Sequence, residues 1–154
     1  MEIERKLAEM GLELPSVTPP IANFVSAVRT GNLLFVAGHV PRMPDGSFLN
    51  PGKLGQDVTI EQGYESARRA MLNCLASARE HLGDLDKVKR VVKLLCMVNS
   101  APDFGDQPRV ANGASDLLVN LYGERGRHAR SAVGMGGLPS SNCIEIEMIL
   151  EVDD

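Results

Sequence analysis

The end of the chain alternates between apolar and acidic residues, a pattern typical of a β-strand with one buried face. Carboxylates at Glu145, Glu147 and Glu151 are separated by the apolar residues Ile144, Ile146, Met148 and Leu150. Successive side chains of a strand point to opposite faces of the sheet. The pattern therefore predicts a sheet that is covered on one face and carries carboxylates on the other.

Two apolar stripes predict helices that could cover such a sheet. Thr59 and Gln62 form a capping box at the start of the first helix, and Gly83 is a typical helix end. The stripe between them consists of Ala67, Met71, Cys74, Leu75, Ala78 and Leu82. A second helix is predicted over residues 107–122, where the stripe is Val110, Ala114, Leu117, Leu118 and Leu121.

The remaining strands complete the predicted sheet. Residues 24–29 and 33–37 flank a turn signal at Gly31-Asn32 and indicate a hairpin. Residues 88–98 are apolar and β-branched, and residues 131–135 precede the closing strand at 143–152. The order ββ-α-β-α-ββ predicts an α+β fold, with two helices packed on one face of a mixed sheet. Because residues 88–98 are apolar on both sides, we expect the uncovered face to be buried against another copy.

The first residues are expected to lie outside this body. A short helix is predicted over residues 2–10, and an extended linker follows because of the prolines; the residues concerned are Ile3, Leu7, Met10, Pro15, Pro19 and Pro20. We expect residues 1–19 to form a helical extension and linker. Residues 20–154 are expected to form a single domain, which suits a chain of 154 residues.

Composition narrows the classes of partner. The net charge of -4, with no Trp, two Tyr and four Phe, argues against nucleic-acid binding. No apolar run approaches the roughly 20 residues that span a bilayer, so no membrane partner is expected. No metal site is expected, since the three histidines lack ligand spacing.

The cysteines indicate reduced thiols and a cytoplasmic location, because they are widely spaced and form no CxxC pair. Cys74 and Cys96 are expected in the core. Cys143, which opens the last strand, is expected to be partly exposed.

Two polar residues near the end of the chain are candidates for chemistry. Arg130 begins a strand after a loop, where its guanidinium fork could overhang a cleft and bind a carboxylate. The simpler alternative is a surface Arg or a structural ion pair. Glu145 could orient or deprotonate water, although a solvated strand face is again the simpler interpretation.

Several separated motifs, in order and at the right intervals, resemble the signature of the Rid (reactive intermediate deaminase) family, also called the YjgF family. They are Ala37-Gly38-His39-Val40-Pro41, Ala129-Arg130-Ser131, Leu138-Pro139 and Ile144-Glu145-Ile146-Glu147. The resemblance runs from about residue 20 to the end, and the helical leader is similar to that of a longer-chain branch. It implies a fold like chorismate mutase of the AroH type, a homotrimer with clefts between subunits, and a small-molecule carboxylate substrate.

Active members of this family hydrolyse 2-imino and 2-enamino acids to 2-keto acids and ammonia without a cofactor. The resemblance implies that Arg130 binds the substrate carboxylate and that Glu145 handles water or a proton. It also implies backbone contacts at Ala132 and Gly38. A helix Asn of the family corresponds to Asn112.

Three residues depart from the family pattern. Ala132 stands where typical deaminases have Cys, Phe24 where a cleft Tyr is usual, and His39 where Gln is usual. His39 is either a hydrogen-bonding residue satisfied within the fold or a proton-transfer group. Two other functions therefore stay open: a non-catalytic protein that binds a keto acid in the same cleft, and an endoribonuclease, against which the acidic charge argues.

Overall fold

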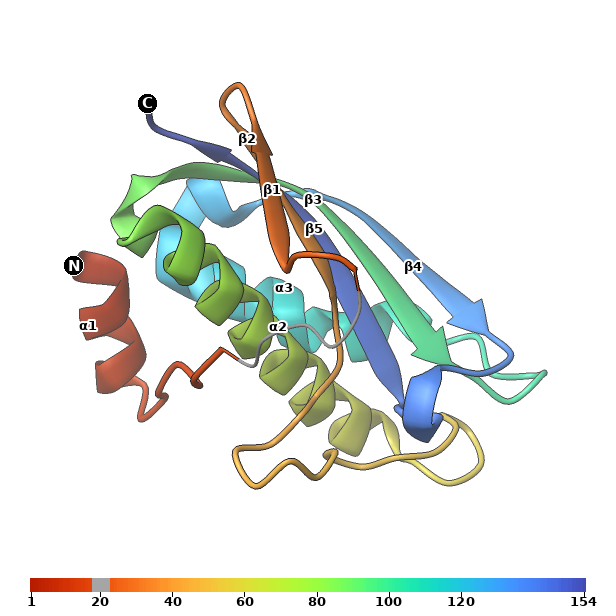
Figure 1. The fold of residues 1–154 in the computed structure, drawn as a ribbon. Helices are drawn as coiled ribbons and strands as arrows, with labels where there is room; N and C mark the ends of the chain where they lie inside the picture. Colours follow the sequence, from red (N-terminus) through yellow and green to blue (C-terminus); the bar gives the residue numbers. More distant parts are fainter. Residues whose placement is uncertain (18–22) are drawn as a thin grey trace.

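The computed structural model describes residues 1–17 and 23–154. Its elements are α1 (Glu2–Glu9), β1 (Ala27–Thr30), β2 (Leu33–His39), α2 (Ile60–Leu82), β3 (Val88–Asn99), α3 (Gln107–Tyr122), β4 (Ala129–Met135) and β5 (Ile144–Val152), shown in Figure 1. Short 3₁₀ turns lie at Leu85–Lys87, Gly123–Gly126 and Pro139–Ser141. The predicted order of elements is confirmed. The part of the predicted linker at Pro19 and Pro20 lies outside the described residues.

The strands form one mixed sheet in the order β1-β2-β5-β3-β4. All pairs are antiparallel except β3 with β4, which the α3 crossover connects in parallel. Thr30 pairs with Leu33, so Gly31 and Asn32 form the predicted hairpin turn. This order leaves β4 at the edge of the sheet, which matters for the site because Arg130 lies on that strand.

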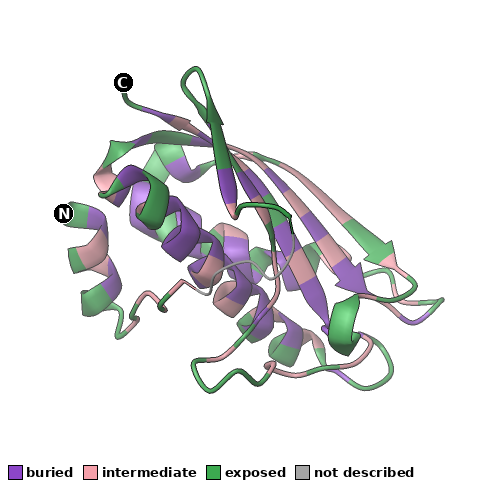
Figure 2. Ribbon diagram, viewed as in Figure 1, coloured by how far each residue is buried: buried purple, intermediate pink, exposed green. Residues whose placement is uncertain are grey.

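The helices α2 and α3 lie together on one face of the sheet (Figure 1). Their buried side chains and those of β5 form one core. The buried residues are coloured purple along the ribbon in Figure 2. The predicted capping box at Thr59 and Gln62 is present, and α2 ends at Gly83 with φ 82°. Gly113 allows α3 to approach α2, because a β-carbon there would collide with the Tyr64 carbonyl.

The first helix, α1, packs against the core of the fold. Ile3 and Leu7 are buried and belong to the same core as α2 and α3. Helix α1 contacts α3 and the 3₁₀ turn at Leu85–Lys87. Within the described residues, no helix has the length and hydropathy that crossing a bilayer requires.

One cysteine prediction was wrong. Cys74 and Cys96 are buried as expected, but Cys143 is also fully buried. The Cys143 thiol lies beside the buried Ser66 side chain of α2, so the helix covers it. The loop before α2 is hydrogen-bonded to the backbone at this end of the sheet. Its Gly52 N–H donates to the Ser141 carbonyl at 2.7 Å, and its Leu54 N–H donates to the Asn99 carbonyl at 2.8 Å.

Candidate functional site

Arg130 is held against α3 by two neutral oxygen atoms. Its Nη1 donates to Asn112 Oδ1 at 2.9 Å and to Ser115 Oγ at 3.0 Å. Asn112 and Ser115 lie three positions apart on α3, so they share one helix face. Arg130 pairs with Leu94 of β3, which is fully buried under the helices, and its side chain therefore leaves the sheet on the helix face.

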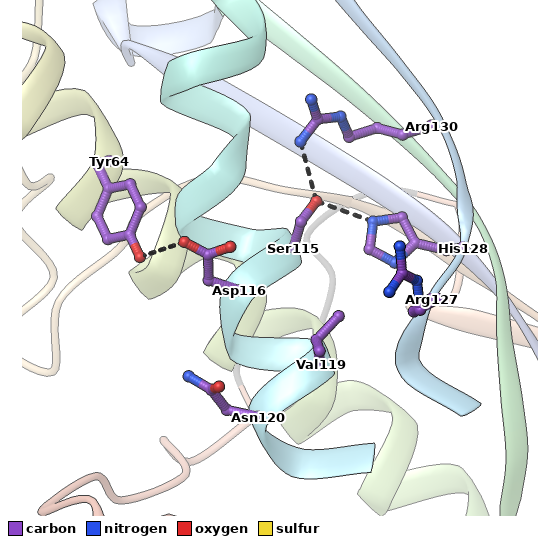
Figure 3. Close-up of a pocket in the computed structure, with 8 residues that line it drawn as sticks. All are labelled: Tyr64, Ser115, Asp116, Val119, Asn120, Arg127, His128 and Arg130. Atoms are coloured by element: carbon purple, nitrogen blue, oxygen red, sulfur yellow. Dashed lines mark hydrogen bonds between the residues drawn. The ribbon is translucent and has the colours of Figure 1, made fainter. Parts of the chain in front are cut away.

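The hydrogen bonds continue from Ser115 to His128. Ser115 Oγ lies 2.8 Å from His128 Nε2, and His128 Nδ1 lies 2.7 Å from the Gly126 carbonyl oxygen. Figure 3 shows Ser115 between the two basic side chains. Burial lowers the pKa of His128, the Gly126 carbonyl raises it, and the neighbouring Arg130 charge lowers it further.

The Arg130 guanidinium has no carboxylate partner within residues 1–17 and 23–154. Both of its hydrogen bonds there use Nη1, which leaves Nε and Nη2 as a pair of parallel donors. A carboxylate accepts two parallel hydrogen bonds from such a pair. The arrangement can therefore bind an anionic carboxylate without breaking an internal ion pair.

A cavity of about 600 Å³ lies beside Arg130. It is lined by Tyr64, Ser115, Asp116, Val119, Asn120, Arg127, His128 and Arg130 (Figure 3). Tyr64 from α2 donates its hydroxyl hydrogen to Asp116 Oδ2 at 2.7 Å, so this acid already has a partner. The cavity lining includes three basic side chains, those of Arg127, His128 and Arg130, and one carboxylate, that of Asp116.

Glu145 and Gly38 form a second group on the other face of the sheet. Ile144 and Ile146 on either side of Glu145 are fully buried on the helix face, so Glu145 points away from the helices. Its carboxylate lies against Gly38, where a β-carbon would collide with Oε2. Glu145 is half-buried, and burial followed by the neighbouring Glu147 charge raises the pKa of its carboxyl. A carboxylate with a raised pKa is better matched to proton transfer near neutral pH.

Arg130 and Glu145 therefore lie on opposite faces of one sheet. They are also separated by β3, because β4 and β5 flank it on its two sides. Within one chain the sheet backbone stands between the guanidinium and the carboxylate.

The other candidate residues lie as follows. Ala132 is partly buried on edge strand β4 beside the core and pairs with Cys96. Burial raises the pKa of the Cys96 thiol to about 12, although Arg130 acts against this, so Cys96 supplies no thiolate in place of the missing one. Phe24 is 57% exposed and does not line the cavity beside Arg130.

His39 has both ring nitrogens engaged on the helix side of the sheet. Nδ1 lies 2.6 Å from the Ala37 carbonyl, and Nε2 lies 2.7 Å from Ser77 Oγ on α2. Because a carbonyl only accepts, Nδ1 carries the hydrogen and Nε2 accepts from the Ser77 hydroxyl. This geometry matches a hydrogen-bonding residue that is satisfied within the fold.

Ser115 and His128 were not identified as candidates from the sequence. Two spacing signals were available. Ser115 follows Asn112 by about one helical turn. His128 precedes Arg130 by two positions, a spacing that points two side chains of an extended chain in the same direction. Their hydrogen bond depends on the docking of α3 against β4, which neither spacing predicts.

The chain matches known proteins over nearly its whole length. The model of the family described as "YjgF/chorismate mutase-like, putative endoribonuclease" matches residues 4–150. Protein TCP17 of Trypanosoma cruzi is 41% identical over 153 residues, 99% of this chain and 95% of that protein. The crystal structure of protein Atu1372, of unknown function, from Agrobacterium tumefaciens is 43% identical with a TM-score of 0.92, over 98% of this chain and 92% of that one.

RidA from the Antarctic bacterium Psychrobacter sp. PAMC 21119 is 21% identical with a TM-score of 0.61, over 89% of this chain and 94% of that one, a likeness of fold alone. The extent of the family match and of the similarity to TCP17 and Atu1372 is decisive. The chain belongs to the YjgF/chorismate mutase-like family.

Proposed function

We propose that this protein is a hydrolytic deaminase that converts small 2-imino or 2-enamino acids to 2-keto acids and ammonia. One observation carries the proposal above the others. Arg130 is held by Asn112 and Ser115 with no carboxylate partner in the described chain, and its Nε and Nη2 stay free as a pair of parallel donors. Such a group is suited to binding the carboxylate that every 2-imino acid carries.

The proposed reaction needs one bound water and one carboxylate base. Arg130 fixes the substrate carboxylate, and Glu145 takes a proton from water as the oxygen attacks the imine carbon. Glu145 then returns the proton to the nitrogen, which leaves a tetrahedral carbon that bears a hydroxyl and an amino group. In a second transfer Glu145 takes the hydroxyl proton and gives it to the amino nitrogen, so that the carbonyl forms as the carbon–nitrogen bond breaks and ammonia leaves. The raised pKa of Glu145 supports this double role, because the carboxyl exchanges a proton more easily near neutral pH.

The opposite placement of Arg130 and Glu145 supports a cleft to which two copies of the chain contribute. We propose that edge strand β4 of one copy carries Arg130 to the open sheet face of a neighbour, where Glu145 and Gly38 lie. This agrees with the homotrimer that the family resemblance implies. A closed ring repeats one such contact around its axis.

Apolar side chains on the open face support this assembly. Val28 is 54% exposed and Phe35 is 42% exposed, and the two are cross-strand partners. A cavity of about 460 Å³ on this face is lined by these two residues together with Val25, Leu95 and Ile149, among others. An apolar surface of this kind is commonly covered by another subunit. Light scattering should give a mass near 50 kDa for a trimer, whereas 16.6 kDa at micromolar concentration would contradict it.

A second candidate is a protein that binds a keto acid in the same cleft without turnover. Ala132 favours it, because the thiol of typical deaminases is absent, and the exposed Phe24 supplies no hydroxyl donor. Two measurements separate the candidates: hydrolysis of freshly generated 2-iminopropionate, and calorimetric titration with 2-ketobutyrate. The deaminase predicts both turnover and binding that are lost in Arg130→Ala. Binding without turnover above the uncatalysed rate would favour the second candidate.

A further inference from the structure

The hydrogen bonds behind Arg130 run in one fixed direction. The Gly126 carbonyl can only accept, so His128 Nδ1 carries a hydrogen. In the neutral ring Nε2 is then an acceptor, and the Ser115 hydroxyl donates to it at 2.8 Å. Having donated its only hydrogen, Ser115 Oγ presents lone pairs alone to Arg130 Nη1 at 3.0 Å.

The surroundings favour the neutral form of His128. Two cations, Arg127 and Arg130, line the same cavity and oppose a further positive charge. The one carboxylate of the cavity lining, Asp116, accepts from the Tyr64 hydroxyl rather than from the ring. Burial and the Arg130 charge both lower the pKa of His128.

We propose that Ser115 and His128 are positioning residues that hold the Arg130 guanidinium ready for its ligand, with His128 in the neutral Nδ1–H form. The proposal rests on the proposed function, since it assigns these residues to the carboxylate-binding group. Arg has a long side chain whose rotamers are many in solution. Two acceptors on one nitrogen restrict it and leave Nε and Nη2 free to donate, which reduces the ordering that ligand binding must supply.

The same three residues could be taken for a nucleophile and its base, because a Ser hydroxyl that donates to His is typical of acyl-transfer sites. Two features argue against this. Ser115 lies inside α3, where neighbouring backbone N–H groups are used by the helix and cannot form an oxyanion hole. Its oxygen also lies between Arg130 and His128, which occupy the approaches that an acyl group needs.

Nuclear magnetic resonance of ¹⁵N-histidine protein tests the hydrogen bonds without any ligand. At pH 7, His128 should show a protonated Nδ1 and an unprotonated Nε2. Ser115→Ala should shift the Nε2 resonance, Arg130→Ala should raise the pKa of His128, and Asn120→Ala should do neither. Asn120 is the matched control because it lines the same cavity without a side-chain hydrogen bond to either residue. A protonated Nε2 at pH 7, or equal His128 pKa values in wild type and Arg130→Ala, would overturn the proposal.

Binding of 2-ketobutyrate tests the consequence for the site. Ser115→Ala should weaken binding roughly tenfold. His128→Gln should weaken binding less, because an amide oxygen can still accept the Ser115 hydrogen bond. Ser115→Thr keeps the hydroxyl and should bind like wild type. If Arg130→Ala abolishes binding while Ser115→Ala binds like wild type, the positioning role is wrong and the proposed function stands. If wild-type binding does not depend on Arg130, the proposed function is wrong. Covalent labelling of Ser115 by a fluorophosphonate would replace the positioning role with a nucleophilic one.

Discussion

The Glu145 carboxylate occupies the space that a side chain at Gly38 would need. A β-carbon built at position 38 collides with Oε2 of Glu145, and the two residues come from neighbouring strands β2 and β5. The absence of a side chain therefore lets the carboxylate rest against the β2 backbone in a half-buried position. This contact fixes where the proposed base stands, and it explains why a glycine matters at this point of the hairpin strand.

Gly38→Ala should lower turnover without unfolding the protein. The new methyl group must push the carboxylate aside, and a displacement of about 1 Å at a reacting group can cost about 100-fold in rate. Gly105→Ala is the matched control, because a β-carbon there meets no other atom and its φ is not in the left-handed region. Steady-state kinetics on 2-iminopropionate provide the measurement. Equal kcat values for the two variants would show that the position of Glu145 is not needed for turnover.

Arg130→Ala should weaken 2-ketobutyrate binding by about 30-fold or more, because one partner of a hydrogen-bonded charge pair is lost. Arg130→Lys keeps the charge but not the fork, so its affinity should fall between wild type and Arg130→Ala. Isothermal titration gives all three values. Thermal unfolding should be little changed, since Arg130 bonds only to Asn112 and Ser115 among the described residues. Wild-type affinity in Arg130→Lys would mean that charge alone suffices.

Removing the charge of Glu147 should shift the acidic limb of the pH–rate profile. Burial and the Glu147 charge both raise the pKa of Glu145, so its base form is lost as pH falls through a value above the ordinary 4.5. Glu147→Gln removes the repulsion, lowers that pKa and shifts the limb to lower pH. Glu151→Gln, farther along the same strand face, is the control and should leave the limb in place. A limb that moves equally in both variants would assign it to another group.

Folding stability should fall as pH drops below about 6.5. Burial lowers the pKa of His39, and the Ala37 carbonyl only partly offsets it, so the unfolded chain binds more protons than the folded one in this range. His128, also lowered, acts in the same direction. The melting temperature measured from pH 8 to pH 5 should decline, and His39→Gln should decline less while matching wild type near pH 8. Parallel curves for the two proteins would exclude His39 as a source of the effect.

The architecture could be predicted from the sequence because it depends mainly on the local spacing of apolar residues and on turn and capping residues. The capping box at Thr59, the turn at Gly31 and the alternation around Glu145 all depend on neighbours in the chain, and all are present. The burial of Cys143 was missed because it depends on the packing of α2, far earlier in the chain, against this end of the sheet.

The candidate site was predictable in its residues but not in its arrangement. Asn112 and Arg130 are 18 positions apart, and only the docking of α3 against β4 brings them into contact. Ser115 and His128 are marked in the sequence only by their spacing from Asn112 and Arg130, which does not predict that they are partners, because their hydrogen bond joins two separate elements. The placement of Arg130 and Glu145 on opposite faces could not be predicted, because it depends on the order in which the strands pair. Alternation within single strands does not determine that order.

That placement leads to a test of the shared cleft by mixing inactive subunits. Arg130→Ala lacks the carboxylate fork, and Glu145→Gln lacks the base, so each protein alone should be inactive. If one cleft takes Arg130 from one copy and Glu145 from the next, a mixed assembly contains clefts with both native residues. Random exchange at equal concentrations should give about a quarter of clefts with the native pair. Turnover of 2-iminopropionate after mild dissociation and reassociation of the mixture should therefore rise to about a quarter of the wild-type rate. The control mixes Arg130→Ala with a double variant that carries both changes, which should stay inactive. A mixture of the two single variants that stays inactive, although mass measurement shows exchanged subunits, would place both residues in one chain's own cleft.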